Sequence, residues 1–262
     1  MKYILKSIPG YIFVLITLLS LSVAYATSTL EAKQVAENVY HRDVGSDLQM
    51  TGAMELISKS GHVRHRGMTT LRRDTECERR VLIRFTSPAD IRDTAFLVVE
   101  DAADNTTQQH LYLPALKRTR RIVASQQGRN FVNSDFTYED MQRHPVAEWD
   151  YALKAPEPVL GYDCYVLVST PKPETETQYG KIISWIEKEH FIPLRTLFWN
   201  KKGEQTKTYT VEKIALIDGI ATEMSALMED HSDQHQTRMT THSAQYNTGL
   251  PARFLTTRAL EP

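Results

Sequence analysis

The sequence predicts a mainly β protein of the α+β class, built on one large, strongly curved antiparallel sheet with a long N-terminal helix on its concave side. Thirteen segments are rich in β-branched and aromatic residues, and several alternate apolar with polar. Turn residues such as Ser60-Gly61 and Asp218-Gly219 separate them at short spacing, which indicates hairpins. An open sheet of this many strands curls, and two helical segments leave a cavity on the face they partly cover.

The first 26 residues have the organisation of a cleaved secretory signal. Lys2 and Lys6 precede an apolar run over residues 11–23, and Ala24-Tyr25-Ala26 is a small-x-small cleavage site. The alternative, an uncleaved membrane anchor, needs an apolar run of about 20 residues and is disfavoured. No cysteine follows the site, so we expect a periplasmic protein, cleaved after Ala26, without an N-terminal lipid. Residues 27–262 are expected to form a single domain.

The mature chain is expected to open with a helix from Thr29, as N-cap, to Gly45, with an apolar stripe that includes Val35, Val39 and Tyr40. A short helix is expected at 138–143, with Thr137 and Asp140 as a capping pair and Pro145 after its end. The expected strands are 50–58, 63–72, 78–86, 94–100, 108–113, 117–123, 147–154, 162–170, 181–189, 194–200, 205–213, 220–229 and 236–243.

Charge and cysteine content restrict the function classes. The chain has 31 Lys and Arg against 32 Asp and Glu, so it lacks the basic excess typical of nucleic-acid-binding proteins. The two cysteines, Cys77 and Cys164, are too few for a structural zinc site. Export permits a disulfide between them, and the alternative is two separate buried thiols.

The strand at 117–123 is unusually cationic. Lys117, Arg118, Arg120 and Arg121 point alternately to both faces, so no arrangement hides them all, and we expect this strand at an edge of the sheet. One interpretation is a solvated surface paired with Asp135, Glu139 and Asp140. The other is a contact for a lipid head group or an acidic partner, made by Arg118, Arg120 and Arg121.

The following aromatic cluster, Phe131, Phe136 and Tyr138 with Met141, has two interpretations: core packing, or a lid over the cavity. The string 229–235, with His231 and His235, contains metal-ligand types but falls where a hairpin turn is expected, and we predict no metal site. Catalytic and nucleotide-binding signatures such as His-Glu-x-x-His or Gly-x-Ser-x-Gly are absent from the sequence, so we expect neither an enzyme nor a cofactor.

Five stretches carry a resemblance to a known family. They are RFTSPADIRDTAFL (84–97), LYLPALKR (111–118, with Arg120-Arg121-Ile122 after it), SDFTYED (134–140), YDCYVL (162–167) and IPLR (192–195). In this order they resemble the outer membrane lipoprotein-sorting protein family, relatives of the LolA and LolB carriers. The resemblance spans about residues 30–255. It implies an unclosed half-barrel around helices, with an apolar cavity for acyl chains, and a link to RND-type lipid exporters.

The resulting hypothesis is a non-catalytic carrier that passes a lipoprotein or lipid toward the outer membrane. Its cavity and lid would be lined by Leu97, Leu111, Leu113, Phe131, Phe136, Tyr138 and Trp149. Each buried CH₂ of an acyl chain contributes about 0.8 kcal/mol, so no covalent step is needed. Two alternatives remain: an accessory subunit that docks on an exporter without cargo, and, more distantly, a lipid-modifying enzyme on the same scaffold.

Overall fold

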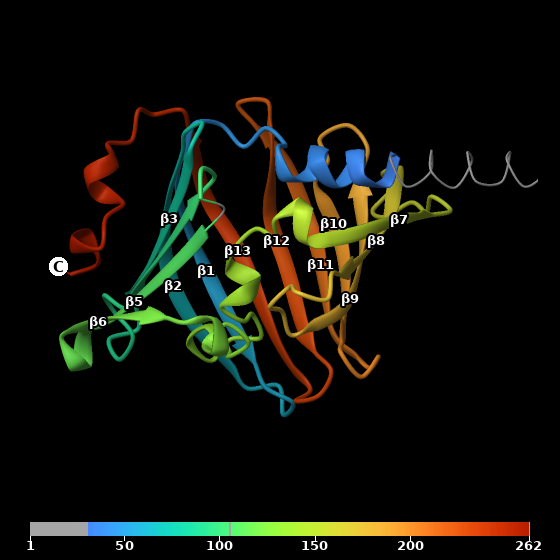
Figure 1. Cartoon of the computed structure of the whole chain (residues 1–262). Helices are drawn as coiled ribbons and strands as arrows, with labels where there is room; N and C mark the ends of the chain where they lie inside the picture. The colour runs from blue at the N-terminus through green and yellow to red at the C-terminus, as the bar shows by residue number, and fades with distance from the viewer. Residues whose placement is uncertain (1–30, 105, 262) are drawn as a thin grey trace, which may run out of the picture.

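The computed structural model describes residues 31–104 and 106–261, in which thirteen antiparallel strands form one sheet of order β6-β5-β4-β3-β2-β1-β13-β12-β11-β10-β9-β8-β7 (Figure 1). The strands are β1 (Asp47–Ile57), β2 (Val63–Asp74), β3 (Glu78–Ser87), β4 (Ala95–Asp101), β5 (Thr106–Leu113), β6 (Arg118–Ile122), β7 (Trp149–Lys154), β8 (Cys164–Pro171), β9 (Tyr179–Glu187), β10 (Pro193–Asn200), β11 (Gln205–Ile217), β12 (Ile220–Asp230) and β13 (His235–Tyr246). Each of the thirteen expected strands is present, and the predicted fold class is confirmed.

The sheet is not closed, because its two edges are β6 and β7. These strands are consecutive in the chain, yet they lie at opposite ends of the sheet. Residues 123–148, which we call the crossing segment, connect them across the concave face as a series of short 3-10 turns (Figure 1). The N-terminal helix, residues 31–40, lies on the same side of the sheet. The concave face is therefore covered by two separate elements.

An aromatic core holds the crossing segment against the first half of the sheet. The Phe131 ring lies 5.0 Å from that of Phe96 and 5.8 Å from that of Tyr138, between centroids. Phe96 and Phe131 have no exposed surface, and Leu111 and Tyr138 are buried with them. Burial of each such side chain is worth about 1.5–3 kcal/mol. This part of the crossing segment is packed as core.

The C-terminal segment covers the opposite face of β3–β5. Leu250, Leu255 and Leu260 pack there against Leu82 and Leu97. The Arg84 guanidinium donates hydrogen bonds to the carbonyl oxygens of Ala259, at 2.6 Å, and Leu260, at 3.2 Å. Leu97 is therefore on the far side of the sheet from the cavities, and its predicted place in the lining is wrong.

The expected helix at 138–143 is a single 3-10 turn, Glu139–Met141. The predicted capping pair is present: the Thr137 N–H donates to the Asp140 carboxylate at 2.7 Å, and the Asp140 N–H donates to Thr137 Oγ1 at 3.3 Å. The turn does not extend because Gln142 is already in the extended conformation, shortly before Pro145.

The N-terminal helix ends at residue 40, earlier than expected, and Gly45 beyond it has a φ of +71°. The expected Thr29 cap and the signal with its cleavage site at Ala26 lie outside the described residues. In the described part of the chain, no helix combines the length and the hydropathy needed to cross a membrane.

Candidate functional site

The helix cavity, as we name it, is an apolar space of about 320 Å³ between the N-terminal helix and β7–β9. Its volume is in the range of small-molecule sites. The apolar side chains that line it come from the helix, the crossing segment and the strands: Ala36, Val39, Tyr40, Val146, Trp149, Tyr151, Leu167, Ile182, Ile186 and Pro193. The polar residues of the lining are Gln142, Arg143, His144, Ser169 and Ser184.

The helix sequence explains why this space stays open. Ala32, Val35 and Ala36 pack on Leu167 and Ile186, and the small alanines let the helix approach the sheet. One turn later, Val39 and Tyr40 are only partly buried. The close contact at the start of the helix is therefore lost at its end, where the cavity lies.

A second space of about 280 Å³, the sheet cavity, lies between the crossing segment and the middle of the sheet. Phe136, Met50, Met68 and Met239 contribute its flexible apolar surface. Tyr209 also lines it and donates a hydrogen bond to Glu223 Oε2 at 2.5 Å. Burial, and then the Glu223 charge, raise the pKa of Tyr209 well above its ordinary value, so this phenol stays a hydrogen-bond donor.

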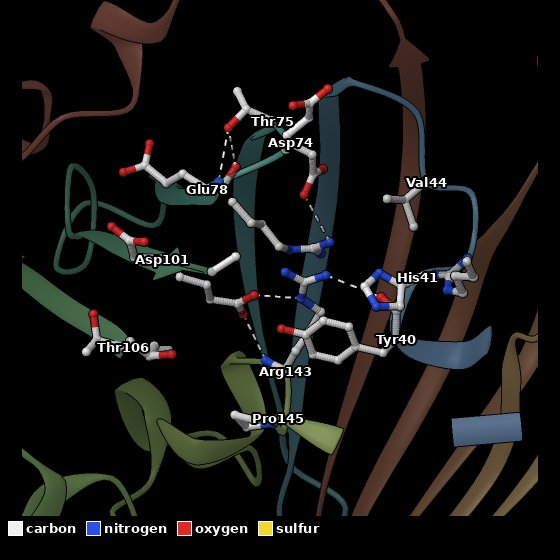
Figure 2. A pocket seen from close by; sticks show the side chains of 16 residues that line it. Tyr40, His41, Val44, Asp74, Thr75, Glu78, Asp101, Thr106, Arg143 and Pro145 are labelled. Atoms are coloured by element: carbon white, nitrogen blue, oxygen red, sulfur yellow. Dashed lines mark hydrogen bonds and ion pairs between the residues drawn. The ribbon is translucent and has the colours of Figure 1, made fainter. Parts of the chain in front are cut away.

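A third space of about 220 Å³, the polar cavity, lies where the helix end meets β2–β5 (Figure 2). Tyr40, Asp74 and Arg143 point into the same region in this view. The Arg143 Nε donates to Glu100 Oε2 at 2.6 Å, and its guanidinium lies 4.2 Å from the centroid of the Tyr40 ring. Tyr40 and Arg143 line both this cavity and the helix cavity, so the two spaces adjoin.

Two arginines lie beside Asp74 of the polar cavity: Arg79, which is partly buried and lines it, and Arg72, which is buried and lines the sheet cavity. The Arg72 Nε lies 2.6 Å from Asp74 Oδ2, and Arg72 also donates to the carbonyl oxygen of Val44. Burial lowers the pKa of Arg72, although the Asp74 charge opposes that effect. For Arg79, burial lowers the pKa to about 10, and the Asp74 charge again opposes this effect. Both arginines therefore bear a desolvation cost that the nearby carboxylates, Asp74 for both and also Glu100 for Arg79, only partly offset.

The predicted lining residues are divided among these spaces and the core. Trp149 lines the helix cavity and Phe136 the sheet cavity. Leu111, Phe131 and Tyr138 are buried in the aromatic core, with Leu113 half-buried beside it. Sequence reasoning did not identify Tyr40 and Arg143 as lining residues. Of the two, only Tyr40 was recognisable in the sequence, as the last residue of the apolar stripe on the N-terminal helix.

The cationic strand, β6, is an edge strand as predicted. Arg118, Arg120 and Arg121 are exposed and line none of the three cavities. The acids that we expected to pair with them bind elsewhere: Asp135 contacts His235, Glu139 accepts from Thr177, and Asp140 pairs with Lys207. That predicted pairing is wrong, and the three arginines face solvent.

Other sequence candidates have structural roles. Cys77 and Cys164 are separate free thiols, as in the second of the two alternatives, but only Cys164 is buried; Cys77 is exposed, so its expected burial is wrong. In the string 229–235, Asp230 Oδ1 accepts the N–H groups of Ser232 at 2.8 Å and Asp233 at 3.1 Å, as in a polar turn. His231 contacts Thr208 Oγ1, at 2.9 Å.

Several known proteins share this fold. A family model described as an uncharacterized protein matches residues 78–262, while the curated proteins offer no match. A DUF1329 family protein from Desulfovibrio piger is 29% identical, with a TM-score of 0.83 over 89% of this chain and 99% of that one. A putative outer membrane lipoprotein-sorting protein domain from Vibrio parahaemolyticus is 27% identical, with a TM-score of 0.82 over 89% and 100%.

A LolA superfamily protein from Nitrosomonas europaea, 18% identical, shares the fold with a TM-score of 0.65 over 88% of this chain and 99% of that one. The matches extend over most of each chain. From the family match and these structures, the chain belongs to the outer membrane lipoprotein-sorting protein family, with a LolA-like fold.

Proposed function

We propose that this protein is a periplasmic, non-catalytic carrier that holds the acyl chain of a lipid or lipoprotein in the helix cavity and passes it toward the outer membrane. The observation that carries the proposal is the apolar space of about 320 Å³ between the N-terminal helix and β7–β9. Membership of a lipoprotein-sorting family supports the same class of cargo. The proposal includes export through the signal at residues 1–26 and a single carrier domain over residues 27–262.

The energetics of such a site suit a carrier. Each buried CH₂ contributes about 0.8 kcal/mol, so a few methylenes in the cavity give reversible binding and a whole acyl chain gives stable shielding. The partly buried Val39 and Tyr40 at the end of the helix provide a wall that can move outward with less loss of packing than Ala32 and Ala36. Release would then occur at that end.

A volume-filling substitution tests the proposal. Ser169 lines the helix cavity and is half-buried, whereas Thr170 next to it is exposed on the other face of β8. We expect Ser169→Phe to lower the amount of lipid that copurifies with the protein by about tenfold, because the ring occupies the space of several methylenes. Thr170→Phe is the matched control and should retain wild-type lipid. Equal lipid in both variants, at equal thermal stability, would refute the helix cavity as the cargo site.

A second candidate function rests on β6. Its exposed Arg118, Arg120 and Arg121 lie on a free sheet edge and away from the cavities, which favours contact with an acidic surface of a membrane partner over contact with an enclosed head group. We propose an RND-type exporter as that partner. Charge reversal of the three arginines to Glu should abolish pull-down of the exporter while copurifying lipid is unchanged. An accessory subunit without cargo would lose the exporter and hold no lipid in any variant.

A further inference from the structure

The guanidinium of Arg79 in the polar cavity lacks a carboxylate of its own. Its side chain is 19% exposed, and its one hydrogen bond among the described residues goes to Asp74 Oδ1, at the long distance of 3.4 Å. Asp74 is already paired with Arg72, at 2.6 Å. The buried Arg72 and the partly buried Arg79 therefore share the Asp74 carboxylate, which is costly in a partly desolvated site.

The other acids of the polar cavity are engaged or lie at its rim. Glu100 accepts from the Arg143 backbone N–H and side chain, at 2.9 and 2.6 Å. Glu78 accepts from Arg80 Nη2 at 2.7 Å, and Asp101 accepts the N–H of Ala103 at 2.9 Å. Glu76 is exposed to solvent. Glu100, opposite Arg79 on β4, is therefore shared with Arg143, so Arg72, Arg79 and Arg143 have two carboxylates, Asp74 and Glu100, between them among the described residues.

The electrostatics of Arg79 agree with this geometry. Burial is the largest cause that lowers the pKa of Arg79, to about 10; the Asp74 and Glu100 charges oppose this effect, and the Arg72 and Arg143 charges add to it. A bound anion would raise the pKa of Arg79. It would also satisfy the N–H groups of Arg79 that have no protein acceptor in the described part of the chain.

We propose that the polar cavity binds a phosphate-type anion on Arg79, as the head group of the amphiphile whose acyl chain occupies the helix cavity. The inference rests on the proposed carrier function, because it needs the chain in the adjoining space. Tyr40 and Arg143 border both cavities, so an amphiphile in the apolar space would place its polar end beside the cavity that Arg79 lines. A guanidinium presents paired N–H donors that match a phosphate better than an ammonium does. Free phosphate shares this chemistry, and the experiment separates the two sources.

The experiment measures binding of three probes by calorimetry to the full-length mature protein after delipidation: 1-myristoyl lysophosphatidic acid, 1-myristoylglycerol and inorganic phosphate. The variant is Arg79→Gln. The control is Arg73→Gln, on the opposite face of the same strand pair, since Arg73 is opposite Arg80 whereas Arg79 is opposite Asp74. Arg79→Lys, which keeps the charge but not the paired donors, provides a second variant if Arg79→Gln folds poorly.

We expect the wild-type protein to bind the lysophosphatidic acid at least about tenfold more tightly than the glycerol lipid. Arg79→Gln should remove that difference, Arg79→Lys should reduce it, and Arg73→Gln should keep it. Equal affinity of the wild-type protein for both lipids would overturn the head-group inference and leave the carrier proposal intact. Binding of inorganic phosphate alone, lost in Arg79→Gln, would identify an anion site for free phosphate and contradict the carrier.

Discussion

Lys207 on β11 and Asp140 in the crossing segment form an ion pair of 3.2 Å, with side chains only 6% and 5% exposed. The same carboxylate accepts a hydrogen bond from the Tyr179 hydroxyl at 2.6 Å and from the Thr137 N–H at 2.7 Å. Burial, followed by the Asp140 charge, raises the pKa of Tyr179 well above its ordinary value, so the phenol remains a donor. This cluster fixes the crossing segment to β9 and β11, in the half of the sheet that ends at β7.

Removal of one partner of this pair should be strongly destabilising. We expect Lys207→Met to lower the free energy of unfolding by about 3–5 kcal/mol, because the Asp140 carboxylate would stay buried without its counter-charge. Urea denaturation followed by circular dichroism measures the change. The double variant Lys207→Met/Asp140→Asn should be less destabilised than the single one. A loss below about 1 kcal/mol in Lys207→Met would mean that the pair does not hold the segment.

Phe131 provides a test of whether the crossing segment is core or a loosely packed lid. Its ring has no exposed surface, so we expect Phe131→Ala to cost about 3–5 kcal/mol of unfolding free energy. The control is Leu116→Ala, at a side chain that is 68% exposed, for which a change within about 0.5 kcal/mol is expected. A mobile lid would show the opposite pattern: a small loss at Phe131.

His110 makes stability depend on pH. Burial, and then the charge of Arg121 opposite it on β6, lower the pKa of His110 below 6.5. As pH falls through 6.5 toward the folded-state pKa, the unfolded chain binds a proton that the folded chain does not, so this contribution to the free energy of unfolding decreases. Above pH 6.5 the contribution is constant.

An NMR titration of the His110 ring measures this effect. We expect Arg121→Gln to raise the pKa of His110, because the Arg121 charge is one of the two causes that lower it. His110→Gln should remove part of the acid-induced loss of stability between pH 7 and 5. A wild-type His110 pKa at or above 6.5 would show that its surroundings do not disfavour the charged ring.

The two thiols should react very differently. Cys77 is exposed, whereas Cys164 is buried and its pKa is raised by that burial. We expect a maleimide probe to label one cysteine in the native protein within minutes and two in denaturant. Mass spectrometry of tryptic peptides identifies the site, with Cys77→Ser as the control. Failure to label either cysteine until a reductant is added would instead demonstrate the disulfide.

The sheet could be predicted from the sequence because its signals are local. Strand alternation and turn residues are read over a few positions, and they located all thirteen strands and the exposed edge strand β6. The face of a strand could not always be predicted. Ala95, Phe96, Leu97 and Val98 are all buried, so the run has no alternation, and Leu97 was placed on the wrong side.

The site was less predictable because its contacts join distant parts of the chain. Asp140 was expected near the cationic strand, yet its partner Lys207 is 67 residues away in the sequence. Likewise, Tyr40 meets Arg143 only after the crossing segment has folded back over the sheet. Such pairs depend on tertiary packing, and no sequence motif of fixed spacing predicts them.

Native mass spectrometry of the protein, purified from a periplasmic fraction without detergent and followed by lipid extraction, tests the carrier function most directly. We expect a discrete additional mass that corresponds to one acylated molecule, reduced in Ser169→Phe and retained in Thr170→Phe. A mass equal to that of the polypeptide alone, unchanged after incubation with membrane extract, would contradict a carrier and favour the docking subunit.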